Sequence, residues 1–202
     1  MANKKVYLIR HGETDYNRRR IIQGSGVDAP LNENGISQAQ AFYEAYGDIP
    51  FEIVISSTLQ RTVQTISPFI EDGIQHERSA LINEINWGVH EGKVSSPAMV
   101  DAYKEMIAAW ADGDLDASLP QGESARELLG RLQQFIDHLA IREEELILVC
   151  SHGRAIRGLV SLFKNMPPEY MEVVKHANTG LYLLERSNEN WEFVLENETA
   201  HL

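Results

Sequence analysis

The order of apolar and polar residues along the chain predicts strands that alternate with helices. Short apolar runs indicate buried strands at 5–10, 53–56 and 145–150. Apolar residues spaced three and four apart indicate helices at 32–46, 59–70, 124–140 and 155–163. Two final strands, at 181–185 and 191–195, are expected around a Ser-Asn-Glu-Asn turn. This alternation predicts an α/β fold with a mainly parallel sheet.

No internal repeat, low-complexity tract or Gly/Ser linker interrupts the 202 residues. We therefore expect a single domain over 1–202, with a short helical insert around 93–122. Within the insert, apolar residues recur at helical spacing at Met99, Tyr103, Met106, Ile107 and Trp110. This stripe fits either ordinary packing against the domain or an apolar wall beside a substrate.

Composition and charge narrow the class of protein. The 43% of hydrophobic and 24% of charged residues fit a soluble globular protein, and no apolar run approaches the length of a membrane span. The polar start, Met1 to Lys5, does not resemble a signal peptide, and the single Cys150 cannot form an internal disulfide. We therefore expect a cytoplasmic location.

The net charge of −12 argues against nucleic acid as a partner and repels phosphate at long range. A phosphate ligand would need a local group of arginines and histidines. The only basic run, Arg18 to Arg20, is either a solvated surface or a collector of anionic substrates, which added salt would weaken.

Two apolar strands end in similar residues. The first ends in Arg10-His11-Gly12, and the second ends in Ser151-His152-Gly153. A third strand ends at Ser56, and Arg61 follows it. Ligands of open α/β sheets bind beyond the carboxyl ends of the strands, so neighbouring parallel strands would bring these side chains together.

Such a group of residues suits phosphoryl chemistry. Arginine offers paired donors that match phosphate oxygens, and a neutral imidazole is a nucleophile toward phosphorus. Nearby arginines would lower the pKa of His11 and keep its imidazole unprotonated near neutral pH. A lone strand-end His-Gly is usually structural, but two of them with adjacent arginines favour a site.

The ordered motifs resemble those of the histidine phosphatase superfamily, also called the phosphoglycerate mutase-like family. The run Leu8-Ile9-Arg10-His11-Gly12-Glu13-Thr14 followed by Asn17 is similar to its signature. Further segments match in order over nearly the whole chain, with a D-x-P-L segment from Asp28, S-S-x-L-x-R at 56–61, E-x-x-x-G-x-x-E-G at 84–92, P-x-G-E-S at 120–124, Ser151-His152-Gly153 and a late Asn178. The complete series is far more specific than any one motif.

The resemblance implies a three-layer fold, with a mostly parallel mixed sheet flanked by helices. It also implies a phosphomonoester hydrolase that acts on small phosphorylated substrates and uses neither a metal nor another cofactor. His11 would be phosphorylated, and Glu84, desolvated by Ile85 and Trp87, would hold a proton for the leaving oxygen. Glu13 is a rival acid, although a role in holding the loop fits it better. The expected catalytic and phosphate-binding residues are Arg10, His11, Asn17, Gln23, Gly24, Arg61, Glu84, His152 and Gly153.

Other functions stay open. A cofactor-dependent phosphoglycerate mutase would share this chemistry, although the segment between Gly92 and Gly122 holds only two basic residues, Lys93 and Lys104. A non-catalytic binder of phosphorylated ligands would not need the retained nucleophile and acid. A metal enzyme would need a ligand cluster such as H-E-x-x-H, which the sequence lacks.

Three positions, in two segments, depart from the family pattern. Thr58 stands where an acidic residue is common, and Val89-His90 where Asp-Trp is common. These departures concern loop packing and leaving-group recognition rather than the chemistry. The sequence names no substrate and leaves the oligomeric state open, a homodimer included.

Overall fold

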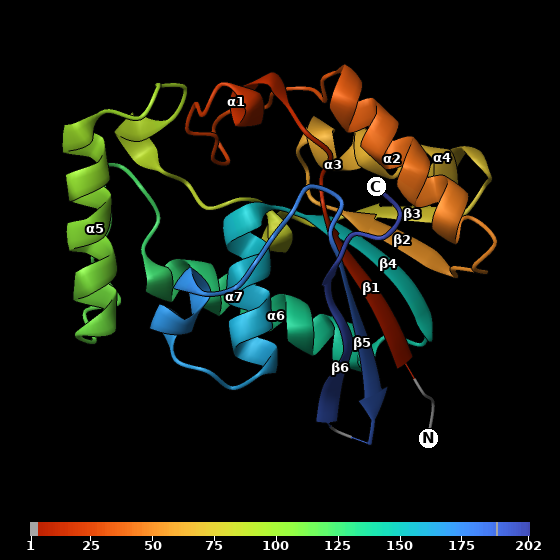
Figure 1. Cartoon of the computed structure of the whole chain (residues 1–202). Coiled ribbons are helices and arrows are strands. Elements are labelled where there is room, and N and C mark those ends of the chain that lie inside the picture. Colours follow the sequence, from red (N-terminus) through yellow and green to blue (C-terminus); the bar gives the residue numbers. More distant parts are fainter. Residues whose placement is uncertain (1–3, 189) are drawn as a thin grey trace.

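The computed structural model describes residues 4–188 and 190–202 (Figure 1). Met1–Asn3 and Glu189, a member of the expected Ser-Asn-Glu-Asn turn, lie outside the described residues. Within these ranges six strands form one sheet in the order β3-β2-β4-β1-β5-β6. The strands are β1 (Lys4–Arg10), β2 (Ile53–Ser56), β3 (Gln75–Arg78), β4 (Leu146–Ser151), β5 (Leu181–Ser187) and β6 (Asn190–Glu198).

The sheet is mixed, as predicted. Neighbours from β3 to β1 are parallel, whereas β5 pairs antiparallel with β1, and β6 pairs antiparallel with β5. Side chains alternate between the two faces of the central strands, so that Leu8 and Val149 belong to one core cluster and Ile9 and Leu148 to the other. Both faces are therefore buried, which explains the nearly continuous apolar runs.

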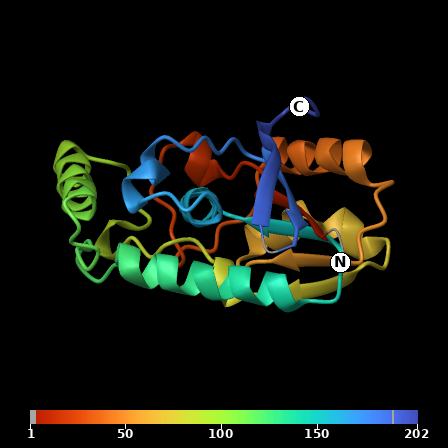
Figure 2. The same ribbon diagram turned by 90° about the horizontal axis from the view of Figure 1, so that it is seen from below.

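Helices cover both faces of the sheet and make the protein three-layered (Figure 2). On one side lie α2 (Glu33–Tyr46), α3 (Gln60–Thr65) and α4 (Ser67–Glu71). On the other lie α6 (Ala125–Ile141) and α7 (Gly153–Phe163). The remaining helical elements are α1 (Asp15–Arg18), α5 (Pro97–Ala111) and the 3₁₀ turns η1 (Ala80–Ile82), η2 (Gly88–His90) and η3 (Pro168–Glu172).

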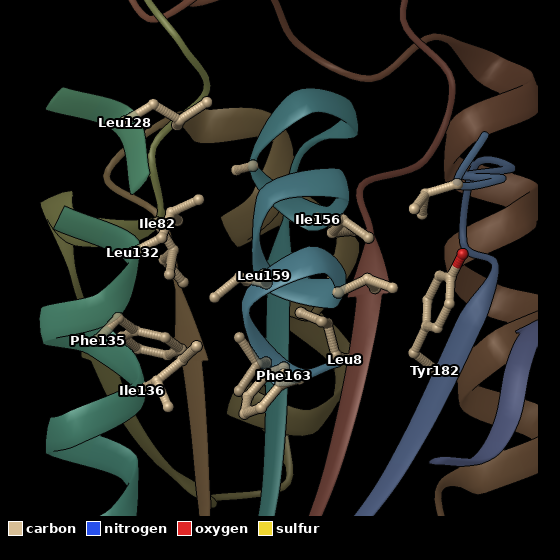
Figure 3. Packing of buried hydrophobic residues seen from close by; sticks show 14 of the residues in the cluster. Leu8, Ile82, Leu128, Leu132, Phe135, Ile136, Ile156, Leu159, Phe163 and Tyr182 are labelled. Carbon is tan, nitrogen blue, oxygen red and sulfur yellow. The ribbon is translucent and has the colours of Figure 1, made fainter. Parts of the chain in front are cut away.

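The larger core lies between α6, α7 and the sheet (Figure 3). Leu128, Leu132 and Phe135 of α6 point toward Leu159 of α7 and Leu8 of β1. Helix α6 begins with a capping box, in which the Ser124 side chain accepts from the Glu127 amide and the Glu127 carboxylate accepts from the Ser124 amide. This helix was predicted within one or two residues at its ends.

Other elements differ from the sequence prediction. The expected helix at 59–70 is divided at Ile66, because Pro68 has no N–H and Ser67 Oγ donates to the Gln64 carbonyl instead. Strand β3 was not predicted, since it is a polar edge strand without an apolar face. Helix α1 was also missed because it has only four residues.

The loop 84–92 docks on the loop 120–123 through backbone contacts. Val89 N donates to Pro120 O at 3.1 Å, and Glu123 N donates to Asn86 O at 2.8 Å. Gly88 lies at the centre of this contact with φ +58°, and a Cβ added there would lie 2.1 Å from Pro120 O. Only glycine satisfies both conditions.

We expect Gly88→Ala to destabilise the protein by at least about 3 kcal/mol, because strain at positive φ adds to a clash with backbone atoms. The matched control is Gly92→Ala, at φ +74° with nothing within 4 Å of the added Cβ, which should cost only about 1 kcal/mol. Urea unfolding of both variants measures the difference. Equal losses would show that the docking contact contributes nothing.

Candidate active site

The sheet register brings two histidines to the same edge. Strands β1 and β4 pair with Arg10 beside Ser151, so that His11 and His152 follow side by side. His11 N donates to Ser151 O at 3.0 Å, and the imidazole centroids are 5.2 Å apart. The site lies where these strands end, between the sheet and α5 (Figure 1).

The His11 imidazole is buried and held in one tautomer. Its Nδ1 lies 2.7 Å from the Gly12 carbonyl, which can only accept, so Nδ1 carries the proton and Nε2 keeps its lone pair. Burial lowers the pKa of His11 well below its ordinary value, and the charges of Arg61 and Arg10 lower it further. The direction agrees with the sequence prediction, but burial contributes more than the arginines.

Arg10 is held by a residue that sequence analysis missed. Its Nη1 donates to the His176 carbonyl at 2.9 Å and lies 3.2 Å from His176 Nδ1. Burial lowers the pKa of His176 to about 4, so its ring accepts as a neutral group. Arg10 Nε is buried and has no hydrogen-bond partner among the described residues. Nothing in the sequence marks His176 except its place two residues before Asn178, which donates to His11 O.

Arg61 is fully buried and linked to His152. Its Nε donates to His152 Nδ1 at 3.1 Å, while Nη1 and Nη2 donate to the carbonyls of Val27 and Gly24. Three of its five N–H donors are therefore used within the protein. Burial lowers the pKa of both Arg10 and Arg61 to about 10, and the nearby Glu84 opposes this shift. Both guanidinium groups keep their charge at neutral pH.

His152 has protein partners at both nitrogens. Nδ1 accepts from Arg61, so the proton lies on Nε2, which donates to Ser57 Oγ at 2.7 Å. Burial lowers the pKa of His152 well below its ordinary value, with a further contribution from the Arg61 charge. This residue is thus neutral and orients Arg61.

The Glu84 carboxylate is bound at the N-terminus of α7. Its Oε1 accepts from the amides of Ile85 and Ala155, and its Oε2 accepts from the amide of Arg154, all at 3.0–3.1 Å. Only 7% of the residue is exposed. Two carboxylate oxygens offer about four lone pairs, so one lone pair on Oε2 stays free.

The remaining predicted residues differ in how directly they contact this group, since Asn17 and Gln23 bind Thr14 whereas Gly24 binds Arg61. Asn17 Oδ1 accepts from the Thr14 amide and caps α1, and Gln23 Oε1 accepts from Thr14 Oγ1. The Gly24 carbonyl accepts a hydrogen bond from Arg61 Nη2, and Gly153 is the first residue of α7. Glu13 instead accepts from the Asn32 side chain at the start of α2, which supports its expected structural role.

The insert helix α5 is joined to α7 by Arg154. The Arg154 guanidinium lies 5.6–5.9 Å from the ring centroids of Trp87, Tyr103 and Trp110, and its Nη1 pairs with Glu172 at 2.5 Å. Met106 and Trp110 are buried in the core. The apolar stripe of the insert is thus divided, with these residues in ordinary packing and Met99 and Tyr103 lining a cleft.

The described residues contain neither a membrane-spanning helix nor a cluster of metal-binding side chains. No helix within 4–188 and 190–202 is long and apolar enough to span a membrane. No three His, Cys, Asp or Glu side chains in these ranges converge as a metal-binding group.

Comparison with known families decides the class of protein. The profile of the histidine phosphatase superfamily (branch 1) matches residues 6–199. The chain belongs to this superfamily. A curated relative, "Probable phosphoglycerate mutase GpmB" of Proteus mirabilis, is 32% identical over 93% of this chain and 87% of its own length.

Solved structures agree with this assignment to the histidine phosphatases. The phosphoserine phosphatase of Entamoeba histolytica, solved as a mutant with phosphoserine, is 28% identical with a TM-score of 0.84, over 98% of this chain and 99% of its own. The α-ribazole phosphatase of Shigella flexneri is 25% identical with a TM-score of 0.83, over 96% of both chains. The predicted three-layer mixed-sheet fold is confirmed.

The buried histidines make the stability of this histidine phosphatase depend on pH. His11, His152 and His176 all have lowered pKa values, so below about pH 6.5 the unfolded chain binds more protons than the native protein. The free energy of unfolding should therefore fall on acidification, by about 1.4 kcal/mol per pH unit for each histidine. For His176 this loss continues to about pH 4.

His176→Asn tests this linkage, since it retains a polar partner for Arg10 but cannot titrate. Urea unfolding between pH 6 and 4.5 should show a slope shallower than wild type by about 1 kcal/mol per pH unit. His138→Asn, at an exposed position on α6, is the matched control and should leave the slope unchanged. An identical slope in His176→Asn and wild type would contradict the neutral state of His176.

Proposed function

We propose that this enzyme hydrolyses phosphomonoesters of small metabolites through a phosphohistidine on His11, without a metal. The observation that carries the proposal is the buried, neutral His11 imidazole, with its Nε2 lone pair beside the buried guanidinium groups of Arg10 and Arg61. A nucleophile that stays unprotonated next to fixed cations meets the needs of phosphoryl transfer.

The phosphoryl group would be bound by donors that the protein itself does not use. Among the described residues Arg10 Nε is buried without a partner, and two N–H groups of Arg61 remain beyond those that bind protein atoms. The N–H of Gly153, at the first turn of α7, is one of the amides that a helix leaves unpaired. These donors would compensate the charge on the equatorial oxygens.

In the first step the His11 Nε2 lone pair attacks phosphorus, and the bond from phosphorus to the ester oxygen breaks. A proton on Glu84 Oε2 passes to the leaving oxygen, so the alcohol departs neutral. In the second step water attacks the phosphohistidine and gives its proton to Glu84, the P–N bond breaks, and phosphate leaves. The amides of Ile85, Arg154 and Ala155 hold this carboxyl group in place.

Replacing His11 with alanine should reduce hydrolysis of p-nitrophenyl phosphate by at least about 10³-fold, because the nucleophile is lost. Wild type quenched during turnover should carry an acid-labile, base-stable phosphoryl label, which His11→Ala should lack. EDTA should leave the rate unchanged. The control His138→Ala, exposed on α6, should retain full activity. Activity in His11→Ala, or a label elsewhere, would contradict the proposal.

Glu84→Gln should slow hydrolysis of alkyl phosphates by about 10²–10⁴-fold, because their leaving oxygens need a proton. The nitrophenolate ion leaves without protonation, so kcat/KM for p-nitrophenyl phosphate, which reports only the steps up to departure of the leaving group, should fall about tenfold or less. Measuring kcat/KM for both substrates in wild type and variant separates acid catalysis in the first step from a general loss of structure. Equal losses for both would argue against a proton donor at this position.

A phosphoglycerate mutase is the second candidate, and the 32% identity to a protein named as one supports it. A mutase uses the same phosphohistidine but returns the phosphoryl group to a hydroxyl instead of water. Incubating the enzyme with 3-phosphoglycerate and the bisphosphorylated cofactor, and measuring isomerisation beside phosphate release, decides between them. Isomerisation that exceeds hydrolysis would replace the phosphatase proposal and leave the role of His11 intact.

We also propose a cytoplasmic location. Cys150 is a free thiol buried at the end of β4, and burial raises its pKa, so it does not depend on an oxidising compartment.

A further inference from the structure

An apolar cleft of about 310 Å³ lies between the insert helix α5 and the loops of the active site. Its apolar walls are formed by Ile22, Trp87, Met99, Val100, Tyr103 and Leu119. Its polar members are Gln23, His90 and Ser95, so the cleft contains no carboxylate, ammonium or guanidinium group.

Two lining residues of the cleft, Gln23 and Trp87, come from the loops that carry the contacts of Arg61 and Glu84. On one side, Gln23 precedes Gly24, whose carbonyl binds Arg61. On the other side, Trp87 lies on the same loop as Glu84, three residues later, and its amide donates to Glu91. The alcohol of a phosphoryl group bound between Arg61 and Glu84 would reach this cleft by extending along Gln23 and Trp87.

The guanidinium group that lies over two of the aromatic walls is paired within the protein. Arg154 lies over the rings of Trp87 and Tyr103, but its charge is paired with Glu172 and it does not line the cleft. A carboxylate in the cleft would meet the donors of Gln23, His90 and Ser95 but no guanidinium or ammonium group to compensate its charge, so its loss of hydration would be costly.

The apolar surface continues to the mouth of the cleft. Val100 is 38% exposed and Val94 64% exposed, and the adjacent Ser95 is part of the cleft. Val94 pairs with Ile21 through a β-bridge, next to Ile22 in the wall. An apolar group that extends outward would therefore keep burying hydrophobic surface.

We infer that the cleft binds the alcohol portion of the substrate and selects phosphomonoesters whose alcohol is uncharged and carries an aromatic ring or an alkyl chain. This inference rests on the proposed function and gives it a substrate class. It also separates this protein from enzymes whose substrates carry a carboxylate beside the phosphate.

The test compares 2-phenylethyl phosphate, ethyl phosphate and 3-phosphoglycerate. The first two have primary alkyl leaving groups, so a difference between them reports binding of the ring rather than chemistry. We expect kcat/KM for the phenylethyl ester to exceed that for the ethyl ester by at least about tenfold. Hydrolysis of 3-phosphoglycerate should be slower than that of either. Equal rates for the two esters, or preference for 3-phosphoglycerate, would overturn the inference.

Val100→Lys places a cation in the cleft, and Val194→Lys is its matched control, since Val194 is 52% exposed on β6 and does not line the cleft. Val100→Lys should lower kcat/KM for the phenylethyl ester by about tenfold and raise it for 3-phosphoglycerate. Val194→Lys should change neither value. The same response in both variants would overturn the inference.

The outcomes also distinguish a failure of the proposed function from a failure of the inferred substrate class. If p-nitrophenyl phosphate and all three substrates were left intact by wild type, the proposed function and the substrate class would both be wrong. If all were hydrolysed without preference for the ring, only the substrate class would be wrong.

Discussion

The hydrogen-bonded parallel pairing of β1 and β4 sets Arg10 beside Ser151 and so brings His11 and His152 to one edge of the sheet. A shift of one residue in this register would turn the side chains of a strand to the opposite face and exchange residues between the two buried core clusters. Packing in the two core clusters therefore fixes the strand register, and the register fixes the positions of His11 and His152. Core packing and the position of the site depend on the same contacts, although none of the predicted phosphate-binding residues belongs to either core cluster.

Burial then determines the charge of each group. It keeps His11 and His152 neutral, while Arg10 and Arg61 remain cationic because even their lowered pKa values, about 10, lie far above neutral pH. Buried cations are costly unless they are paired. Here carbonyls, neutral imidazoles and the nearby Glu84 compensate them in part. A protein of net charge −12 thereby holds two neighbouring guanidinium groups in positions that its own contacts fix.

Much of this could be predicted from sequence, because buried strands and amphipathic helices have strong periodic patterns. Strands β1, β2 and β4 and helix α6 were found within one or two residues, and their order placed the histidines. Edge strand β3 has no apolar pattern to recognise. His176 was missed because its contact with Arg10 joins residues 166 positions apart. The sequence also could not separate the packed residues of the insert from those that line a cleft. That division depends on the position of Arg154 among the rings of Trp87, Tyr103 and Trp110.

The central claim is that the His11 Nε2 lone pair faces a tetrahedral anion held by Arg10 and Arg61. The most direct measurement is a crystal structure of the enzyme with vanadate, which adopts the five-coordinate geometry of phosphoryl transfer. The account predicts vanadium bonded to His11 Nε2, with vanadate oxygens on Arg10 Nε and Arg61 and an apical oxygen directed to Glu84 Oε2. Vanadate bound away from His11, or through a nitrogen of His152, would contradict it.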